Sequence, residues 1–279
     1  MNYSDLYKQI VAKKSFLCVG LDPDLAKIPQ HLLGCENPIF EFNKAIIDAT
    51  APYAVAFKPN CAFYEAEGLE GWKQFVMTVE YIKKNYPEIL VIADAKRGDI
   101  GNTAKKYAQC FFKSMDCDAV TLAPYMGSDS INPFLEYDDK WAVVLALTSN
   151  KSADDFEQLS TFDENDSDED FDVKPLFSRI ISKVMTFGTR DNIMFVVGAT
   201  RPEKLAEIRE ICPDNFLLVP GVGAQGGTVA DVARYGLNDH CGLLVNSSRG
   251  VIYASSGEDF AAAAAAAAKK LAEEMAAVL

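Results

Sequence analysis

The sequence predicts an α/β fold, a single (β/α)8 TIM barrel that spans residues 1–279 as one domain. Short apolar runs, each as long as a buried parallel strand, alternate with helical patterns along the chain. A chain of 279 residues also has the length that such a barrel needs. One acidic insertion after the fifth strand accounts for most of the surplus length. The expected strands are 16–21, 53–57, 89–93, 119–122, 141–147, 193–197, 216–219 and 242–245.

The helices expected between these strands have recognisable starts and apolar faces. Ser4 is expected to cap a leading helix, and Asn37 followed by Pro38 is typical of a helix start. Between the second and third strands, apolar residues recur at helical spacing and predict a helix that packs on the sheet. These residues are Trp72, Phe75, Val76, Val79 and Ile82. After the last strand, residues 261–279 begin with eight alanines and predict a closing helix.

The segment 151–174 is the one low-complexity insertion in the predicted barrel. Ten acidic residues and no lysine or arginine lie between Asp154 and Asp172. This composition predicts a disordered or mobile loop that is solvated rather than a binding tail. Without these ten acids the formal net charge of −13 would be −3, so the acidity is local and says little about partners.

Composition excludes several classes of function. The chain has no basic face for nucleic acid and no apolar stretch of the roughly 18 residues that span a membrane. The polar N-terminus shows no signal peptide, and seven scattered cysteines without a CxxC pattern favour reduced thiols in a cytoplasmic protein. The only histidines, His31 and His240, lie in no motif, which argues against a Ser-His-Asp triad or a histidine-rich zinc site.

Polar chemistry is concentrated where the predicted strands end. The third strand runs into the motif 94–99, which reads DAKRGD. Side chains alternate along a strand, so Asp94 and Lys96 share one face. The first two strands end near Asp22 and Lys58. Because active sites of (β/α)8 barrels lie at the carboxyl ends of the strands, we expect these four side chains to project toward one pocket.

The seventh and eighth strands end in glycine-containing segments that predict a phosphate site. Residues 220–227 read PGVGAQGG and residues 246–250 read NSSRG. Glycines let backbone N–H groups approach an anion, and a following helix N-terminus adds its positive end. Arg249 is expected to grip phosphate bidentately, with Gln225 as a neutral donor. Barrels commonly bind phosphate at these two strand ends.

The charged residues allow two interpretations. With almost no histidine in the chain, proton transfer falls to Lys, Asp or Glu, and Lys96 is the best-placed general acid because Asp94 supplies a counter-charge. The alternative is a salt-bridge network that closes the barrel, although four buried charges without a ligand are costly to desolvate. On the motif 94–99 alone, a plain ion pair at a strand end is an equal alternative.

With these residues in view, the chain resembles the orotidine 5′-monophosphate decarboxylase family, in particular its longer bacterial branch. The pattern Asp-x-Lys-x-x-Asp at Asp94, Lys96 and Asp99 is the signature of that family. The match covers most of the chain, and further motifs follow in the family's order. These motifs are LDP at 21–23, FKPNCAFYE at 57–65, DIGNT at 99–103, VGAT at 197–200, PGVGAQGG at 220–227 and SRG at 248–250.

The resemblance implies a cofactor-free and metal-free reaction, the decarboxylation of orotidine 5′-monophosphate to UMP and CO₂ as the last step of UMP synthesis. By this analogy Lys96 protonates C6 of the pyrimidine while the carboxylate leaves, and Asp94 lies against that carboxylate. Lys58 and Asp99 complete the catalytic charges. The resemblance also implies a homodimer, in which Asp99 and Thr103 reach into the neighbouring site.

The same resemblance assigns the substrate contacts. Ser149 would hydrogen-bond the pyrimidine and Asp22 the ribose. Gln225, Arg249 and the adjacent Gly250 would hold the phosphate. The chain departs from the family after Ser149, where residues 150–153 replace a common Pro-Gly turn. The resemblance therefore does not define the geometry of the lid loop that follows the fifth strand.

Two rival functions remain. A metal-dependent sugar-phosphate decarboxylase or aldolase-like synthase shares the Asp-x-Lys-x-x-Asp pattern, but Lys58 at the second strand end disfavours a cation there. A catalytically silent nucleotide-binding barrel is the other, and the complete set of charges argues against it.

Overall fold

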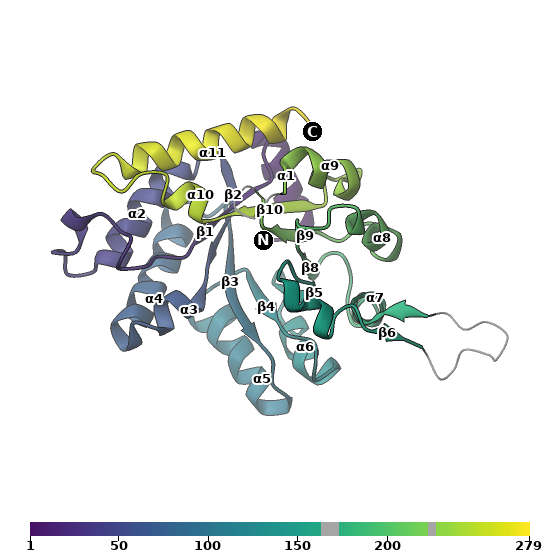
Figure 1. Cartoon of the computed structure of the whole chain (residues 1–279). Coiled ribbons are helices and arrows are strands. Elements are labelled where there is room, and N and C mark those ends of the chain that lie inside the picture. Colours follow the sequence, from purple (N-terminus) through teal and green to yellow (C-terminus); the bar gives the residue numbers. More distant parts are fainter. Residues whose placement is uncertain (163–172, 223–226) are drawn as a thin grey trace.

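A computed structural model describes residues 1–162, 173–222 and 227–279 of the chain. Eight parallel strands close into a barrel in the order β1-β10-β9-β8-β5-β4-β3-β2 (Figure 1). The predicted (β/α)8 barrel is therefore confirmed. Its strands are β1 Leu17–Leu21, β2 Ala54–Pro59, β3 Leu90–Arg97, β4 Ala119–Leu122, β5 Trp141–Leu147, β8 Ile193–Val197, β9 Leu217–Pro220 and β10 Leu243–Ser247.

Two strands run further than their apolar residues predicted. β2 continues through Lys58 because Gly20 of β1 pairs with it, and β3 continues to Arg97, which pairs with Leu122 of β4. Asp94 and Lys96 therefore lie within β3 and not in a loop that follows it. Parallel pairing with the neighbours, and not side-chain hydropathy, sets where these strands end.

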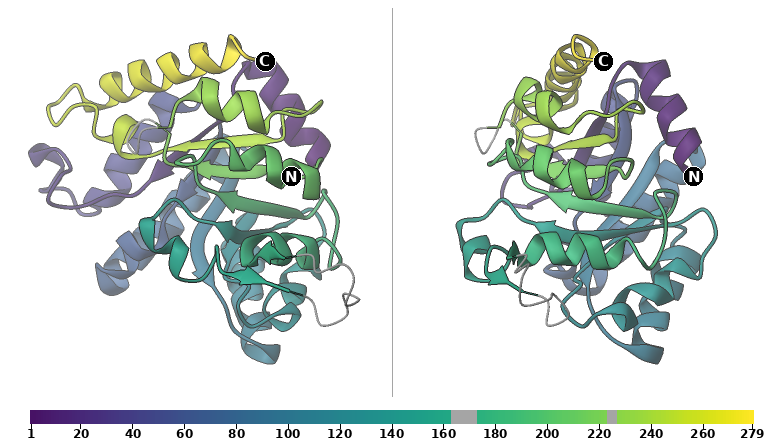
Figure 2. Two further views of the ribbon diagram at one scale, coloured as in Figure 1. Left: turned by 45° about the vertical axis from the view of Figure 1, so that its right-hand side comes forward. Right: turned by 90° about the vertical axis from the view of Figure 1, so that its right-hand side faces the viewer.

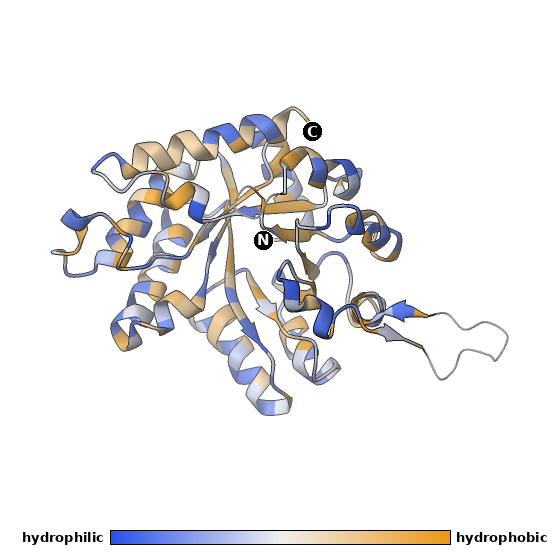
Figure 3. Cartoon of the chain, viewed as in Figure 1, coloured by the Kyte–Doolittle hydropathy of each residue, from blue (hydrophilic) through white to orange (hydrophobic). Residues whose placement is uncertain are grey.

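The strands form the centre of the apolar core. All residues of β1, β4 and β8 are buried, and Figure 3 shows largely apolar strands surrounded by helices in which apolar and polar residues alternate. Removal of each large apolar side chain from water contributes about 1.5–3 kcal/mol to folding. The largest fully buried side chains include Phe57, Phe75, Trp141, Phe195 and Phe216.

Helices surround the barrel, as Figure 2 shows from two further sides. In the described parts of the chain, no helix is both long and apolar enough to cross a membrane. The longer helices are α1 Tyr3–Lys13, α2 Pro38–Thr50, α4 Gly68–Asn85, α5 Gly101–Ala108, α6 Ser128–Leu135, α7 Leu176–Val184, α8 Lys204–Ile211, α9 Val229–Gly236 and α11 Phe260–Ala276. The short segments are η1 Gln30–Leu32, α3 Cys61–Glu65, η2 Gln109–Ser114, η3 Lys151–Asp155 and α10 Arg249–Ile252.

The predicted starts of the first two helices have different outcomes. α2 begins at Pro38 as expected, although Asn37 makes no side-chain cap hydrogen bond. The prediction that Ser4 caps the leading helix is wrong, because α1 begins at Tyr3, two residues earlier than a cap at Ser4 implies. Asn2 is the cap, and its side chain accepts a hydrogen bond from the Asp5 N–H at 3.0 Å.

The predicted apolar stripe of α4 is confirmed. Phe75, Val79 and Ile82 are fully buried, and Trp72 and Val76 pack partly buried against the same core. The Trp72 and Phe75 rings stack with centroids 4.9 Å apart.

The closing helix α11 packs across α2 and α9. Its buried alanines, Ala264, Ala268 and Ala272, recur every fourth residue and form one narrow face. Small side chains at this spacing let α11 lie close to its neighbours. The alanine run thus has a packing role.

The interpretation of segment 151–174 as an unstructured loop is wrong for its described ends. Residues 151–155 form η3, and the short strands β6 Ser160–Thr161 and β7 Lys174–Pro175 pair antiparallel. Leu176 N–H and Phe177 N–H donate to the carbonyls of Leu159 and Glu157. These backbone hydrogen bonds cannot be predicted from composition, and they anchor both ends of the segment at the start of α7. Residues 163–172 lie outside the described residues.

Candidate active site

A cavity of about 250 Å³ opens at the carboxyl ends of the barrel strands. β2 supplies Lys58, while β3 supplies Asp94 and Lys96, and an isolated bridge between Asn60 and Asp94 keeps the two strands in register there. Ser149, after β5, lies on the same wall. The full lining is Lys58, Asp94, Lys96, Thr121, Leu145, Thr148, Ser149, Asn150, Val196, Leu218 and Pro220.

Three of the predicted charges form a continuous chain of ion pairs. Asp94 Oδ2 lies 2.8 Å from Lys58 Nζ, and Asp94 Oδ1 lies 2.6 Å from Lys96 Nζ. The Lys58 side chain is 6% exposed and that of Asp94 is 9% exposed, whereas Lys96 is 50% exposed. Lys58 and Asp94 are therefore fixed inside the barrel mouth, and Lys96 presents its ammonium to the cavity.

Burial and neighbouring charges act in opposite directions on the pKa values of Asp94 and Lys58. Burial alone would raise the pKa of Asp94, but the ammonium groups of Lys58 and Lys96 outweigh it and hold that pKa well below its usual range. Burial would likewise lower the pKa of Lys58, but the carboxylates of Asp94 and Asp22 raise it above its ordinary value. Both groups are therefore charged at neutral pH.

Lys96 has an unusual backbone. Its φ of +46° lies in the left-handed region, which a residue with a side chain seldom adopts. The register between β3 and β4 shifts between Ala93 and Arg97, so Lys96 stands in an irregular part of the strand. The Thr121 hydroxyl on β4 accepts a hydrogen bond from the Lys96 N–H at 2.8 Å. Such outliers cluster at functional sites.

Asp22 lies just past the end of β1, beside the cavity and not on its lining. Its Oδ2 accepts a hydrogen bond from the Ser248 hydroxyl at 2.6 Å. Its Oδ1 is buried and has no partner among the described residues. The Tyr253 hydroxyl donates to the Asp22 carbonyl at 2.9 Å and accepts from the Asp24 N–H at 2.8 Å. Asp22 is therefore held from the segment that follows β10.

The insertion after β5 supports Ser149. The Glu157 carboxylate accepts hydrogen bonds from the Thr148 N–H at 2.6 Å and from the Thr148 hydroxyl at 2.8 Å. On the other side, a Cβ placed on Gly198 would lie 2.6 Å from the Ser149 Cα, so only glycine fits there. Asp154 of η3 pairs with Arg201 at 3.0 Å and joins the loops after β5 and β8.

The residues predicted to hold phosphate are described only in part. β9 and β10 are paired, so their carboxyl ends lie side by side. Arg249 and Gly250 begin α10 and are exposed. Gly250 lines a second cavity of about 480 Å³ together with Gly227, Thr228 and Lys270. Gln225 lies outside the described residues.

Asp99 and Thr103 do not reach this chain's own cavity. Asp99 follows β3, and its Oδ1 accepts a hydrogen bond from the Ile100 N–H at 2.8 Å. Thr103 is exposed in the first turn of α5, and Ile100 between them is 51% exposed. The structure thus separates these two from Lys58, Asp94 and Lys96.

Several residues of the site escaped prediction from the sequence. Thr121 reads as an ordinary β-branched residue of an apolar strand, although it is the one polar residue in that run. Glu157 is hidden among the acids of the insertion, and Tyr253 belongs to no motif. The apolar cavity wall could have been found from strand alternation. Its members are Leu145, Val196 and Leu218.

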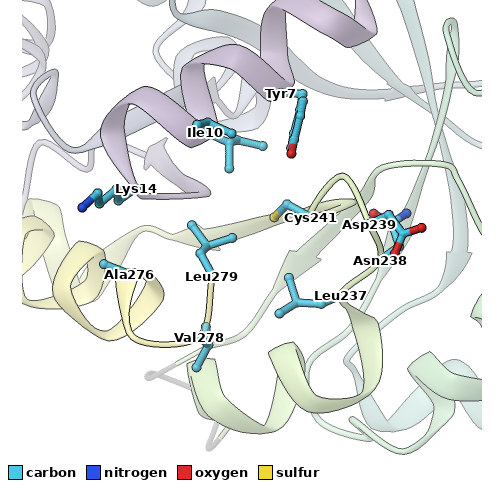
Figure 4. Close-up of a pocket in the computed structure, with 11 residues that line it drawn as sticks. Tyr7, Ile10, Lys14, Leu237, Asn238, Asp239, Cys241, Ala276, Val278 and Leu279 are labelled. Carbon is cyan, nitrogen blue, oxygen red and sulfur yellow. The ribbon is translucent and has the colours of Figure 1, made fainter.

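Three further cavities in the described parts of the chain carry none of the predicted site residues. Figure 4 shows one of about 420 Å³ at the amino-terminal ends of the strands, where Tyr7 and Ile10 of α1 lie near Leu237, Cys241 and Leu279. Within residues 1–162, 173–222 and 227–279, no group of three or more His, Cys, Asp or Glu side chains is placed to hold a metal ion.

Comparisons with known proteins agree with the geometry. Residues 15–266 match the sequence profile of the "Orotidine 5'-phosphate decarboxylase / HUMPS family". Two curated orotidine 5′-phosphate decarboxylases are similar over all of this chain: that of Bacteroides fragilis strain YCH46 is 55% identical with 98% of its length covered, and that of Phocaeicola vulgatus is 54% identical with 99% covered. The solved structure of Leishmania donovani OMP decarboxylase superposes with a TM-score of 0.82 at 38% identity, covering 100% of this chain and 99% of that one.

Proposed function

The chain belongs to the orotidine 5′-phosphate decarboxylase / HUMPS family and is an enzyme that decarboxylates orotidine 5′-monophosphate to UMP, and we propose that Lys96 protonates C6 of the pyrimidine in this reaction. The reaction breaks the bond between C6 and the carboxylate, releases CO₂ and leaves an electron pair at C6. A proton from the Lys96 ammonium then completes the C6–H bond of UMP. We propose that no metal or organic cofactor takes part.

The observation that carries this proposal is the Lys58–Asp94–Lys96 chain at the cavity wall. Of its two ammonium groups, that of Lys58 is enclosed with Asp94, and that of Lys96 is half-exposed toward the space where a ligand would lie. A fixed ammonium stabilises negative charge as it develops at C6 and can then donate its proton. Asp94, held ionised, would lie against the substrate carboxylate.

The substrate contacts follow from the same placement. Asp22 has a buried carboxylate oxygen without a partner in the described parts of the chain, which a ribose hydroxyl would satisfy. Ser149 faces the cavity and would hydrogen-bond the pyrimidine. Gln225, Arg249 and Gly250 would hold the phosphate at the ends of β9 and β10, where barrels commonly bind this group.

We also propose a homodimer in which Asp99 and Thr103 complete the neighbouring site. Both lie outside their own cavity, on the segment that leads from β3 into α5, next to the exposed apolar side chain of Ile100. Residues 1–279 would act as one domain in each subunit. The seven unpaired cysteines favour a reducing, cytoplasmic compartment.

The decisive experiment follows the absorbance of orotidine 5′-monophosphate with the purified protein, with and without excess EDTA. We expect full turnover in EDTA. Lys96→Ala should abolish product formation while UMP still binds in calorimetry, and Lys73→Ala, which removes an exposed lysine of α4, should leave turnover unchanged.

Each rival function gives a different result. Metal-dependent activity on a sugar phosphate, lost in EDTA, would support the metal-dependent relative. Tight UMP binding without turnover would support a silent nucleotide-binding barrel. A Lys96→Ala enzyme that keeps most of its turnover rate would disprove the role of Lys96.

A further inference from the structure

One buried hydroxyl touches Lys96 at its backbone. Thr121 is 1% exposed and lies on β4, where it pairs with Val143 of β5. The register between β3 and β4 shifts between Ala93 and Arg97. At this point the Thr121 side chain, and not a backbone carbonyl of β4, accepts the hydrogen bond from β3. The Thr121 Oγ1 accepts the Lys96 N–H at 2.8 Å.

The same hydroxyl reaches the other end of Lys96 through Asp94. Thr121 Oγ1 donates to Asp94 Oδ1 at 3.0 Å, and this oxygen also accepts from Lys96 Nζ at 2.6 Å. A hydroxyl has one proton to donate and lone pairs to accept, so both bonds of Thr121 can exist together. The Lys96 N–H, Thr121, Asp94 and the Lys96 ammonium thus form a closed ring.

The ring explains how an unfavourable backbone conformation can persist at Lys96. A left-handed residue with a side chain keeps its conformation only where the surroundings determine it strongly. The bond from the Lys96 N–H fixes the backbone, and the bond to Asp94 fixes the carboxylate to which the ammonium is paired. Asp94 is held on its other oxygen by Lys58 at 2.8 Å. Without the hydroxyl, the Lys96 N–H and this carboxylate oxygen both lose their hydrogen bonds to Thr121.

Building on the proposed function, we propose that Thr121 is a positioning residue for proton delivery, which holds Lys96 in its left-handed conformation and orients Asp94 toward it. Proton transfer needs the donor within hydrogen-bond reach of the acceptor atom, and a displacement of about 1 Å can cost a factor of about 100 in rate. Thr121 acts on the chemical step and not on substrate affinity.

The test compares Thr121→Val, which replaces the hydroxyl by a methyl group of similar size, with Thr121→Ser, which keeps the hydroxyl. We expect Thr121→Val to lower kcat by about 10- to 100-fold while UMP affinity changes by less than about threefold. Thr121→Ser should restore most of kcat. Thr50→Val, which removes a buried hydroxyl bonded to the Ile46 carbonyl within α2, is the matched control and should leave kcat unchanged.

Folding and function are separated by parallel measurements. Urea unfolding checks that each variant folds cooperatively. If Thr121→Val does not, Thr121→Cys takes its place, because a thiol is only a weak hydrogen-bonding group and the Cys side chain is compared with the unbranched Ser variant. A kcat within twofold of the unaltered enzyme in the Val or Cys variant overturns the inference. So does an equal loss of kcat and UMP affinity, or a Ser variant as slow as Val. If the unaltered protein itself fails to consume orotidine 5′-monophosphate, the proposed function is what fails.

Discussion

Replacement of Lys58 by methionine removes one of the two ammonium groups that face Asp94. Lys58 Nζ lies 2.8 Å from Asp94 Oδ2, and both side chains are less than a tenth exposed. Two unit charges at this distance attract by about 6 kcal/mol at an effective dielectric constant of about 20. The variant no longer desolvates an ammonium, and Asp94 keeps its bonds to Lys96 and Thr121. We therefore expect the free energy of unfolding to fall by about 3 kcal/mol, which is at the lower end of the range for a broken buried ion pair.

A double-mutant cycle with Asp94→Asn measures the coupling between these two charges. Urea unfolding of the four proteins at pH 7 should give a coupling free energy of about 2–3 kcal/mol. Lys73→Met is the matched control, because its partner Glu70 lies 3.5 Å away and both side chains are about half exposed or more. This exposed pair should contribute less than about 0.5 kcal/mol. Additive effects of Lys58→Met and Asp94→Asn would refute the electrostatic reasoning.

The pH dependence of the same coupling has a definite sign. The folded pKa of Asp94 is depressed, so its stabilisation is present above the ordinary carboxyl pKa of about 4 and is lost as pH falls through the folded value. The folded pKa of Lys58 is raised, so its contribution is present below about pH 10 and is lost as pH rises through the folded value. The coupling should therefore be constant between about pH 5 and pH 9. A maximum confined to a narrow range near neutrality would contradict this assignment.

Two further predictions concern the segments that hold Asp22 and Ser149. Tyr253→Phe removes the hydroxyl that bonds the Asp22 carbonyl and the Asp24 N–H, so KM for orotidine 5′-monophosphate should rise about 5- to 10-fold with little change in kcat, and an unchanged KM in steady-state assays would speak against this role. Gly198→Ala places a Cβ 2.6 Å from the Ser149 Cα and should cost about 1–3 kcal/mol in urea unfolding with a fall in kcat/KM, whereas Gly34→Ala, which meets no atom within 4 Å, should be neutral; equal stability of the two variants would contradict the predicted clash.

The strands could be predicted from the sequence because each is buried on both faces and reads as an apolar run. Their ends could not, because hydropathy stops at Phe57 and Ala93 while backbone pairing carries β2 through Lys58 and β3 to Arg97. The charged side chains at strand ends were recognisable, since a buried strand seldom carries both signs of charge. Lys58, Asp94 and Lys96 are accordingly brought together.

The roles of the residues that support the site could not be predicted from the sequence, because they depend on contacts with other segments of the chain. Thr121 lies 25 positions from the Lys96 N–H that it accepts, and Tyr253 lies 231 positions from the Asp22 carbonyl. The composition of the insertion predicts disorder, yet Glu157 within it is fixed by two hydrogen bonds to Thr148. Local pattern carries no information about such partners.

Closure of the barrel imposes an order on the folding of the nascent chain. β1 pairs with β2 on one side, but its other side pairs with β10, and the contact between Cys18 and Asn246 joins residues 228 positions apart. During synthesis one edge of β1 therefore has no partner until almost the whole polypeptide has left the ribosome. An open strand edge is a template for association with other chains. Contacts of this separation also slow folding, so ring closure is expected to be a late step, during which an incomplete barrel is most vulnerable to aggregation.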